Sequence, residues 1–260
     1  MKFFDSHAHL DDEKFNNDRD EIIKQIHDSE IEKFVSAGYS LESSKVAVEL
    51  GKKYNFIYPT CGISPNDIPQ TEEDLWKQLE EIEELLKTET KIVAVGEIGL
   101  DYYWNTENKE LQKKAFIEQI NLANKYNLPI QIHTREAVMD TIEILKNNTV
   151  KQKGIFHCCP LNRELVKEAL KLGFYISFAG PVTFKNSKNA DEIIKMVPND
   201  KMLIETDSPY LAPDPVRGTR NNPINVKYIA KKIADVKQIE LEQIAELTYK
   251  NAMGIFNLKN

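Results

Sequence analysis

The sequence predicts a single (β/α)₈ TIM barrel, an α/β fold in which parallel strands alternate with helices. Short apolar runs alternate with longer amphipathic stretches eight times along 260 residues, and no composition break or long linker divides them. Histidines and acids follow the ends of several of the apolar runs. We therefore expect one domain over residues 1–260. An open doubly wound sheet is the alternative fold, but such a sheet usually has fewer strands.

Eight segments have the short length, the β-branched and aromatic content, and the polar or Gly/Pro flanks that favour strands over buried helices. In chain order they are 2–9, 32–38, 57–64, 92–99, 129–135, 154–159, 174–180 and 202–207. The helical stretches between and after them are 14–29, 42–54, 72–88, 107–126, 136–147, 161–172, 187–197 and 223–236. An extra C-terminal helix at about 240–256 is expected to pack outside the last unit.

The segment 208–223 is the least regular part of the chain. It contains Pro209, Pro213, Pro215, Gly218 and Pro223, residues that interrupt helices and strands. Because it follows the last predicted strand, we expect a long loop at the catalytic end of the barrel.

The composition is that of an ordinary globular protein, with 41% hydrophobic and 29% charged residues. No apolar run approaches the roughly 20 residues that span a bilayer, so no membrane partner is expected. Three cysteines are too few for a disulfide framework, and we expect a cytoplasmic monomer. The net charge of −7 excludes a general nucleic-acid coat protein. It does not exclude a nucleic-acid enzyme, because bound divalent ions would reverse the local field.

Metal-ligating side chains gather at the ends of the predicted strands. Four of the five histidines lie there, with an acid at the end of two other strands: His7, His9, His133, His157, Glu97 and Asp207. The carboxyl ends of barrel strands meet at one rim, so we expect all six side chains to converge. A lone histidine at a strand end is more often structural, but six agreeing positions favour a metal centre. Six ligands suit two ions that share a bridging carboxylate and a bridging water.

Three further positions leave alternatives open. Glu205 lies one step deeper than Asp207 and either orients a ligand or water, or forms a structural ion pair. Arg135 shares the face of His133 and either clamps a phosphate or neutralises nearby acids. One aromatic ring of 102–104 either stacks a terminal base or packs beneath a loop.

Several short motifs, spread over nearly the whole chain, together resemble those of one known family. They are Asp5-Ser-His-Ala-His-Leu10, Ala94-Val-Gly-Glu-Ile-Gly-Leu-Asp-Tyr102, Pro129-Ile-Gln-Ile-His-Thr-Arg135, His157-Cys158, Glu205-Thr-Asp-Ser-Pro-Tyr-Leu-Ala-Pro213 and Arg217-Gly-Thr-Arg-Asn221. At these residues the chain resembles the TatD family of metal-dependent hydrolases, within the amidohydrolase-type barrels.

The resemblance implies two divalent metal ions, Mg²⁺, Mn²⁺ or Zn²⁺, bridged by Glu97. His7, His9 and Asp207 would complete one ion, and His133 and His157 the other. It also implies phosphodiester hydrolysis, commonly as a 3′ to 5′ exonuclease (a deoxyribonuclease) on DNA, with RNA as a further substrate. Some relatives are credited with deacylating D-aminoacyl-tRNA.

The chain departs from the family pattern at positions that face substrate. The family often has Gly-Ile-His-Pro-His where this chain has Gly62-Ile-Ser-Pro-Asn66, so that Ser64 replaces an imidazole. The motif that often begins His-Cys-Phe-Ser-Gly is His157-Cys-Cys-Pro-Leu161, and Arg-Asn-Glu-Pro becomes Arg220-Asn-Asn-Pro223. None of these changes removes a metal ligand, so they bear on substrate identity more than on hydrolysis.

We therefore predict a two-metal hydrolase acting on nucleic acid. The catalytic candidates are Asp207 as proton acceptor, Glu205, and Arg135 as phosphate clamp. The substrate-binding candidates are Ser64, Asn66, Tyr103, Arg135, Arg217 and Arg220. Two alternatives remain: a D-aminoacyl-tRNA deacylase or other ester or amide metallohydrolase, and a metal-stabilised nucleic-acid-binding protein that has lost catalysis.

Overall fold

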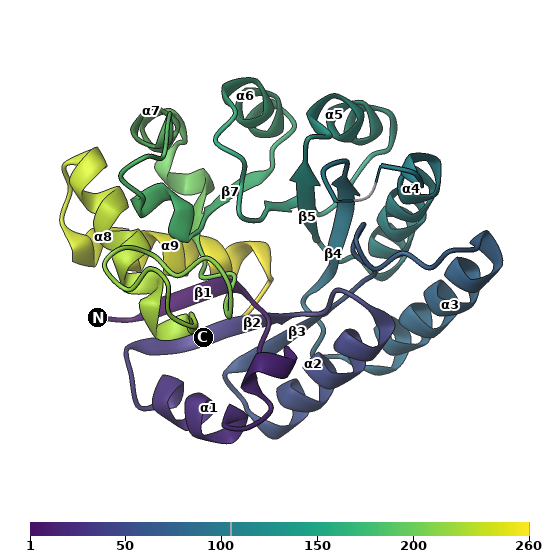
Figure 1. Ribbon diagram of the computed structural model, residues 1–260, viewed down its shortest axis with the longest axis horizontal. Helices are drawn as coiled ribbons and strands as arrows, with labels where there is room; N and C mark the ends of the chain where they lie inside the picture. The colour runs from purple at the N-terminus through teal and green to yellow at the C-terminus, as the bar shows by residue number, and fades with distance from the viewer. Residues whose placement is uncertain (105, 260) are drawn as a thin grey trace.

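The computed structural model describes residues 1–104 and 106–259 and confirms the predicted barrel (Figure 1). Eight parallel strands lie side by side in chain order, each paired with the next from β1 to β8. They are β1 (Phe3–Ala8), β2 (Ile31–Ala37), β3 (Ile57–Cys61), β4 (Ala94–Asp101), β5 (Ile130–Arg135), β6 (Gly154–Phe156), β7 (Tyr175–Phe178) and β8 (Met202–Ile204). This topology brings the carboxyl ends of all eight strands to one rim.

Helices surround the strands and connect them (Figure 1). They are α1 (Arg19–His27), α2 (Leu41–Lys53), α3 (Glu72–Thr88), α4 (Lys109–Tyr126), α5 (Val138–Asn147), α6 (Arg163–Lys171), α7 (Ala190–Met196), α8 (Val226–Lys237) and the extra C-terminal α9 (Leu241–Ile255). Four 3₁₀ turns accompany them: η1 (Glu13–Phe15), η2 (Gly180–Thr183), η3 (Asn199–Lys201) and η4 (Pro223–Asn225).

The C-terminal helix closes one end of the barrel. Ala252, Met253 and Phe256 form a buried apolar cluster with side chains from several strands, among them Phe4 of β1 and Leu203 of β8. The rings of Phe4 and Phe256 stack with centroids 5.8 Å apart. Burial of these side chains stabilises the fold at the amino ends of the strands. The opposite rim is therefore the end that is free for chemistry.

Strands β8 and β1 meet at a junction that polar groups hold together. The Thr206 N–H donates to the Asp5 carboxylate at 2.9 Å, and the Ser6 hydroxyl donates to the Ile204 carbonyl at 3.0 Å. Burial raises the pKa of Asp5 well above its usual range. At the rim, the Asp207 N–H donates to the His7 carbonyl at 3.0 Å. The junction thus places the residues that follow β8 directly beside those of β1.

Several element boundaries differ from the prediction. The strands predicted over 154–159 and 202–207 end earlier, at Phe156 and Ile204, while β4 continues to Asp101. Cys158 and Asp207 have positive φ angles of 36° and 54°, which an extended strand does not allow. The helix predicted over 14–29 is divided into η1 and α1, because the Asn-Asn-Asp sequence at 16–18 favours a helix start over a helix interior.

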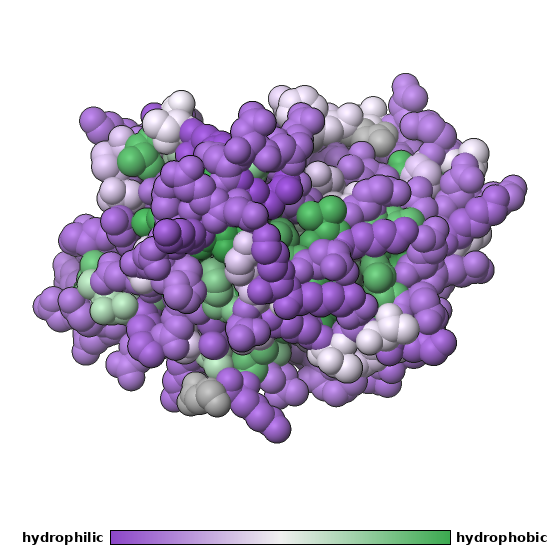
Figure 2. Space-filling model, turned by 90° about the horizontal axis from the view of Figure 1, so that it is seen from below, coloured by the Kyte–Doolittle hydropathy of each residue, from purple (hydrophilic) through white to green (hydrophobic). Residues whose placement is uncertain are grey.

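The outer surface of the helical ring is mainly hydrophilic. Figure 2, seen from below the view of Figure 1, shows hydrophobic residues in small patches among hydrophilic ones. Charged side chains of neighbouring helices pair across it, as Lys45 of α2 does with Glu81 of α3 at 2.8 Å. No helix in the described part of the chain is long and apolar enough to cross a membrane.

Candidate metal centre

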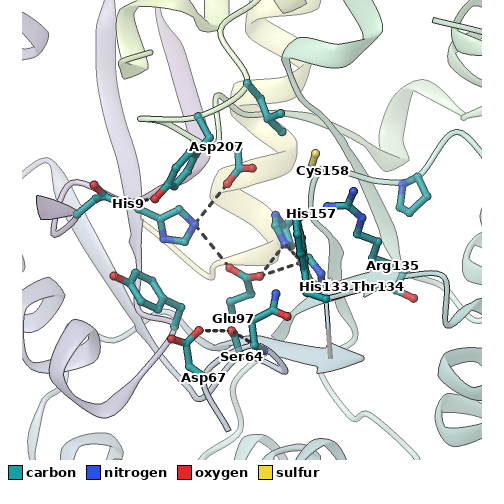
Figure 3. Close-up of a pocket in the computed structure, with 17 residues that line it drawn as sticks. His9, Ser64, Asp67, Glu97, His133, Thr134, Arg135, His157, Cys158 and Asp207 are labelled. Atoms are coloured by element: carbon teal, nitrogen blue, oxygen red, sulfur yellow. Dashed lines mark hydrogen bonds and ion pairs between the residues drawn. The ribbon is translucent and has the colours of Figure 1, made fainter. Parts of the chain in front are cut away.

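An irregularity in β4 aims Glu97 into the mouth of the barrel. The register of β4 with β5 shifts between Val95 and Ile98, as in a β-bulge, which redirects a side chain. Gly96 has φ +159°, and a Cβ there would lie 2.6 Å from the Cβ of Gln131, so the close approach of the two strands requires glycine. The Glu97 N–H donates to the Gly38 carbonyl of the β2–α2 loop at 2.6 Å. Figure 3 shows Glu97 at the centre of the pocket.

One oxygen of Glu97 faces a first ligand group, made of His7, His9 and Asp207. Glu97 Oε2 lies 3.4 Å from His7 Nε2 and 3.6 Å from His9 Nε2. Asp207 Oδ1 lies 3.3 Å from His9 Nε2 and 3.8 Å from His7 Nε2. These atoms are close enough to ligate one ion. All four residues come from the β8–β1 junction or from the irregular part of β4.

The other oxygen of Glu97 faces a second ligand group, made of His133 and His157. Glu97 Oε1 lies 3.0 Å from His133 Nδ1 and 3.2 Å from His157 Nε2. The two imidazole nitrogens are 3.3 Å apart. Figure 3 shows Glu97 between His9 and Asp207 on one side and His133 and His157 on the other. The structure thus brings together all six predicted ligands.

The imidazoles of the first group are held by partners on their other ring nitrogen. His7 Nδ1 lies 3.2 Å from the amide oxygen of Gln131, and His9 Nδ1 lies 2.9 Å from the Ala37 carbonyl. Both partners accept hydrogen bonds, so they fix the proton on Nδ1 and leave Nε2 free to bind a metal. Neutral imidazole with carboxylate is a donor set that divalent metals prefer.

In the second group a buried carboxylate plays the same part for His133, and a second carboxylate lies behind His157. The Nε2 proton of His133 is donated to Asp101 Oδ2 at 2.8 Å, which leaves Nδ1 facing Glu97. His157 Nδ1 lies 3.4 Å from Glu205 Oε1 without a hydrogen bond, while Glu205 Oε1 accepts the Cys158 N–H at 2.6 Å. Glu205 is fully buried behind His157 and lies within ion-pair distance of its ring.

Opposite charges shift the pKa values of the central groups. Burial alone would raise the pKa of Glu97, but His157, His133 and His7 outweigh burial and hold that pKa well below its usual range. Burial lowers the pKa of His9, but Asp207 and Glu97 reverse the shift and raise it to about 9. In the metal-free centre Glu97 is therefore a carboxylate and His9 carries a proton that a metal ion must displace.

Both ligand groups open into one cavity of about 950 Å³. This volume is at the upper end of the roughly 300–1,000 Å³ that small-ligand sites occupy. The residues that line it include the predicted Ser64, Asn66 and Arg135. The Ser64 hydroxyl donates to Asp67 Oδ2 at 2.6 Å, and the Asn66 amide donates to Asp101 Oδ2 at 3.3 Å.

Arg135 is exposed at the edge of this cavity. Within residues 1–104 and 106–259 it makes no ion pair; its guanidinium lies over the ring of Tyr103, 3.9 Å from the centroid. Arg135 therefore forms no ion pair with a nearby acid, which was one of the two roles that the sequence left open for it. The positive charge of Arg135 remains available to a ligand in the cavity.

The two loop arginines are placed differently from the prediction. Arg220 bonds the Asp18 carboxylate and the Lys14 carbonyl, and its guanidinium covers the ring of Phe15. Arg217 lies over the ring of Phe184 at 4.0 Å. Neither lines the cavity. The same loop does reach the cavity, but through Tyr210 and Leu211 and not through its arginines.

Sequence reasoning gave no role to Asp101 or Asp67 and no specific role to Gln131. Strand parity carried a signal for two of them: Asp101 is four residues after Glu97, and Gln131 is two before His133, so each shares a face with a ligand. Asp67 carried no such signal, because it lies in the loop after β3, where it lines the cavity and accepts the Ser64 hydroxyl.

Comparison with known proteins gives consistent results over the whole chain. The family model described as TatD related DNase matches residues 4–257. YabD of Bacillus subtilis, an uncharacterized metal-dependent hydrolase, is 45% identical over 258 residues, covering 98% of this chain and 99% of YabD. YcfH of Escherichia coli, another uncharacterized metal-dependent hydrolase, is 36% identical over 266 residues, covering 99% of this chain and 97% of YcfH.

Solved structures show the same fold. The crystal structure of YJJV, a TatD homolog from Escherichia coli, superposes with a TM-score of 0.92 at 24% identity, covering 99% of this chain and 98% of YJJV. A TatD family hydrolase from Entamoeba histolytica superposes with a TM-score of 0.87 at 25% identity, covering 98% of each chain. The chain belongs to the TatD-related DNase family of metal-dependent hydrolases.

Proposed function

We propose that this protein is a metal-dependent deoxyribonuclease that removes nucleotides from the 3′ end of DNA, with RNA as a further substrate. One observation carries the proposal: the two oxygens of Glu97 face two separate ligand groups at the open rim of the barrel. A carboxylate in this position could be shared by two divalent ions, which would supply the metal activation that phosphodiester hydrolysis uses. The family description as a DNase supports a nucleic-acid substrate.

The ligand sets fit two divalent ions, Mg²⁺, Mn²⁺ or Zn²⁺, which when bound would lower the pKa of water and stabilise charge on the phosphate. His7, His9 and Asp207 would hold one ion with Glu97, and His133 and His157 the other. Hydrogen-bond partners on the far ring nitrogens keep the imidazoles of His7, His9 and His133 in their ligating orientation, so most of the site is organised before substrate arrives.

Asp207 is the proposed proton acceptor. Its Oδ1 faces His9 and His7, and the side chain is 15% exposed to the cavity. Oδ2 is therefore placed to take the proton of the attacking water and to return it to the leaving 3′ oxygen. Burial raises the pKa of Asp207, but His9 and the other imidazoles outweigh burial and lower it, which keeps the group ionised at neutral pH.

Arg135 is the proposed phosphate clamp. Its guanidinium is at the cavity edge and is not neutralised by a carboxylate within the described residues. A planar guanidinium can bind two phosphate oxygens at once and stabilise the charge that develops on them.

The test is product analysis with metal-reconstituted protein. Single-stranded DNA, duplex DNA, RNA and D-aminoacyl-tRNA are incubated separately, each labelled so that the released group is resolved. We expect 5′-mononucleotides released stepwise from the 3′ ends of DNA. Release of the aminoacyl group alone, with all oligonucleotides intact, would contradict the proposal and favour the deacylase alternative.

A further inference from the structure

The turn after β4 displays two large aromatic side chains to solvent. Tyr103 is 48% exposed and Trp104 is 68% exposed. Asp101 holds this turn, because its Oδ1 accepts the N–H of Tyr103 at 2.9 Å and that of Trp104 at 3.0 Å. The two rings are perpendicular, with centroids 4.7 Å apart. An exposed tryptophan on a turn that is tied down by hydrogen bonds indicates a binding surface.

Arg135 completes this surface. Its guanidinium lies 3.9 Å from the ring centroid of Tyr103 and 5.3 Å from that of Trp104. Tyr103 is therefore covered by the guanidinium, while Trp104 keeps most of its ring open. We name Tyr103, Trp104 and Arg135 the aromatic platform. A flat surface of this kind, with an indole and a cation side by side, fits a planar heteroaromatic group next to an anion.

The platform is connected to the metal centre. Trp104 and Arg135 line the same cavity as Glu97, His133 and Asp207. The connection also runs through a single side chain: while Asp101 Oδ1 holds the turn, its Oδ2 accepts the Nε2 proton of His133 at 2.8 Å. The position of the platform is thus fixed relative to the second ligand group.

We propose that the aromatic platform binds an unpaired nucleobase adjacent to the scissile phosphate, stacked on Trp104, while Arg135 contacts the phosphate. This inference rests on the proposed function and names the side chain that receives the base. A base inside a duplex is stacked on its neighbours and would first have to separate from them. Because every base has a π-face, the stacking would be tolerant of sequence.

The test is a double-mutant cycle between Trp104 and the base. Trp104→Ala, Trp104→Phe and the unchanged protein are assayed on an oligonucleotide with normal bases and on two versions that are abasic at the terminal or at the penultimate 3′ position. In the unchanged protein we expect one abasic version to lose about 10-fold in kcat/KM, the effect of one lost stacking contact. On the normal substrate, Trp104→Ala should show the same loss in kcat/KM. On that abasic substrate, its kcat/KM should equal that of the unchanged protein. Trp104→Phe should recover most of the loss.

The matched control is Met139→Ala, which removes an apolar side chain that is 79% exposed on α5 and does not line the cavity. It should leave all three substrates unchanged. If Trp104→Ala lowered kcat/KM by the same factor on the normal substrate and on both abasic substrates, the proposed role of the aromatic platform would be wrong.

A second measurement separates this inference from the proposed function. Binding of an oligonucleotide with a fluorescent 2-aminopurine at the 3′ end is followed in EDTA, where hydrolysis is blocked. Trp104-dependent quenching without any turnover in metal would retain the platform and reject the nuclease. Turnover with no Trp104-dependent quenching and no base dependence would retain the nuclease and reject the platform.

Discussion

The two ligand groups of the metal centre differ in how they are built into the barrel. The first group lies at the β8–β1 junction, where the side chain of His7 is fully buried and that of His9 is 7% exposed. The second group lies on β5 and after β6, and His133 is 20% exposed at the cavity edge. The first group is thus part of the closure of the barrel. The second is tied through Asp101 to the turn that carries Tyr103 and Trp104.

This difference indicates a division of roles. A metal in the first group would link the two strands that close the barrel and so contribute to stability. A metal in the second group would lie nearer the side chains proposed to bind substrate and contribute mainly to turnover. Glu97 faces both groups, with one carboxylate oxygen toward each.

Replacement of the shared carboxylate should have the largest effect. Glu97→Gln keeps the size of the side chain but removes the charge that faces both groups. We expect loss of both ions and a fall in kcat of at least about 10³-fold, because two-metal stabilisation of the reacting oxygens is lost. Metal content by mass spectrometry and kinetics measure these outcomes.

Asp67→Asn is the matched control for Glu97→Gln, since Asp67 lines the same cavity but belongs to neither ligand group. It should retain both ions. If Glu97→Gln also retained two ions per chain, Glu97 would not be the bridge.

Alanine variants of one histidine from each group should separate stability from turnover. His133→Ala should lose one ion and nearly all activity while keeping most of the stabilisation that metal gives. His9→Ala should also lose one ion, but the rise in Tm on metal addition should be largely lost, because the remaining ion no longer links the first group. Calorimetry of both variants with and without metal measures this. Equal Tm responses in the two variants would show that the division of roles is wrong.

Substitution of a partner behind the second group should have a smaller effect. Asp101→Asn places an amide where His133 Nε2 donates its proton, so the ring is no longer held with Nδ1 toward Glu97. Loss of such a partner typically costs about 10–100-fold in metal affinity. We expect that loss in the second group only, measured by titration of metal into the apo protein.

The control for Asp101→Asn is Asp140→Asn. Asp140 bonds the Tyr102 hydroxyl at 2.7 Å, on the same side of the barrel, but contacts no ligand histidine. The metal affinities of the Asp140→Asn variant should be unchanged. If Asp101→Asn bound both ions more weakly, Asp101 would affect both ligand groups and not the second alone.

The fold and the convergence of the six ligands could be predicted because both follow from local patterns. The rule that barrel chemistry lies at the carboxyl ends of strands predicts the rim at which His7, Glu97 and Asp207 meet. The bulge that turns Glu97 inward could not be predicted, because it depends on the close approach of Gly96 to Gln131 in the neighbouring strand.

Loop side chains were harder to place than strand side chains. Arg220 was predicted at the substrate, but its guanidinium is taken by Asp18, 202 residues earlier in the chain. Nothing in the local sequence specifies that pairing. Strand residues inherit their direction from backbone periodicity, whereas the direction of a loop residue is set by whichever partner the tertiary fold supplies.

The smallest predicted effect is the dependence of metal affinity on pH. The pKa of His9 in the metal-free centre is raised to about 9, because Asp207 and Glu97 favour the charged imidazole. A metal ligates only the neutral ring, so below pH 9 each binding event in the first group must release the His9 proton. The sign follows directly: affinity rises as pH rises toward 9, by about tenfold per unit for one displaced proton. Calorimetric titrations at pH 7.5 in two buffers of different ionisation enthalpy count the protons released. We expect at least one, and a count of zero would show that His9 is already neutral and that its acidic neighbours do not hold its proton.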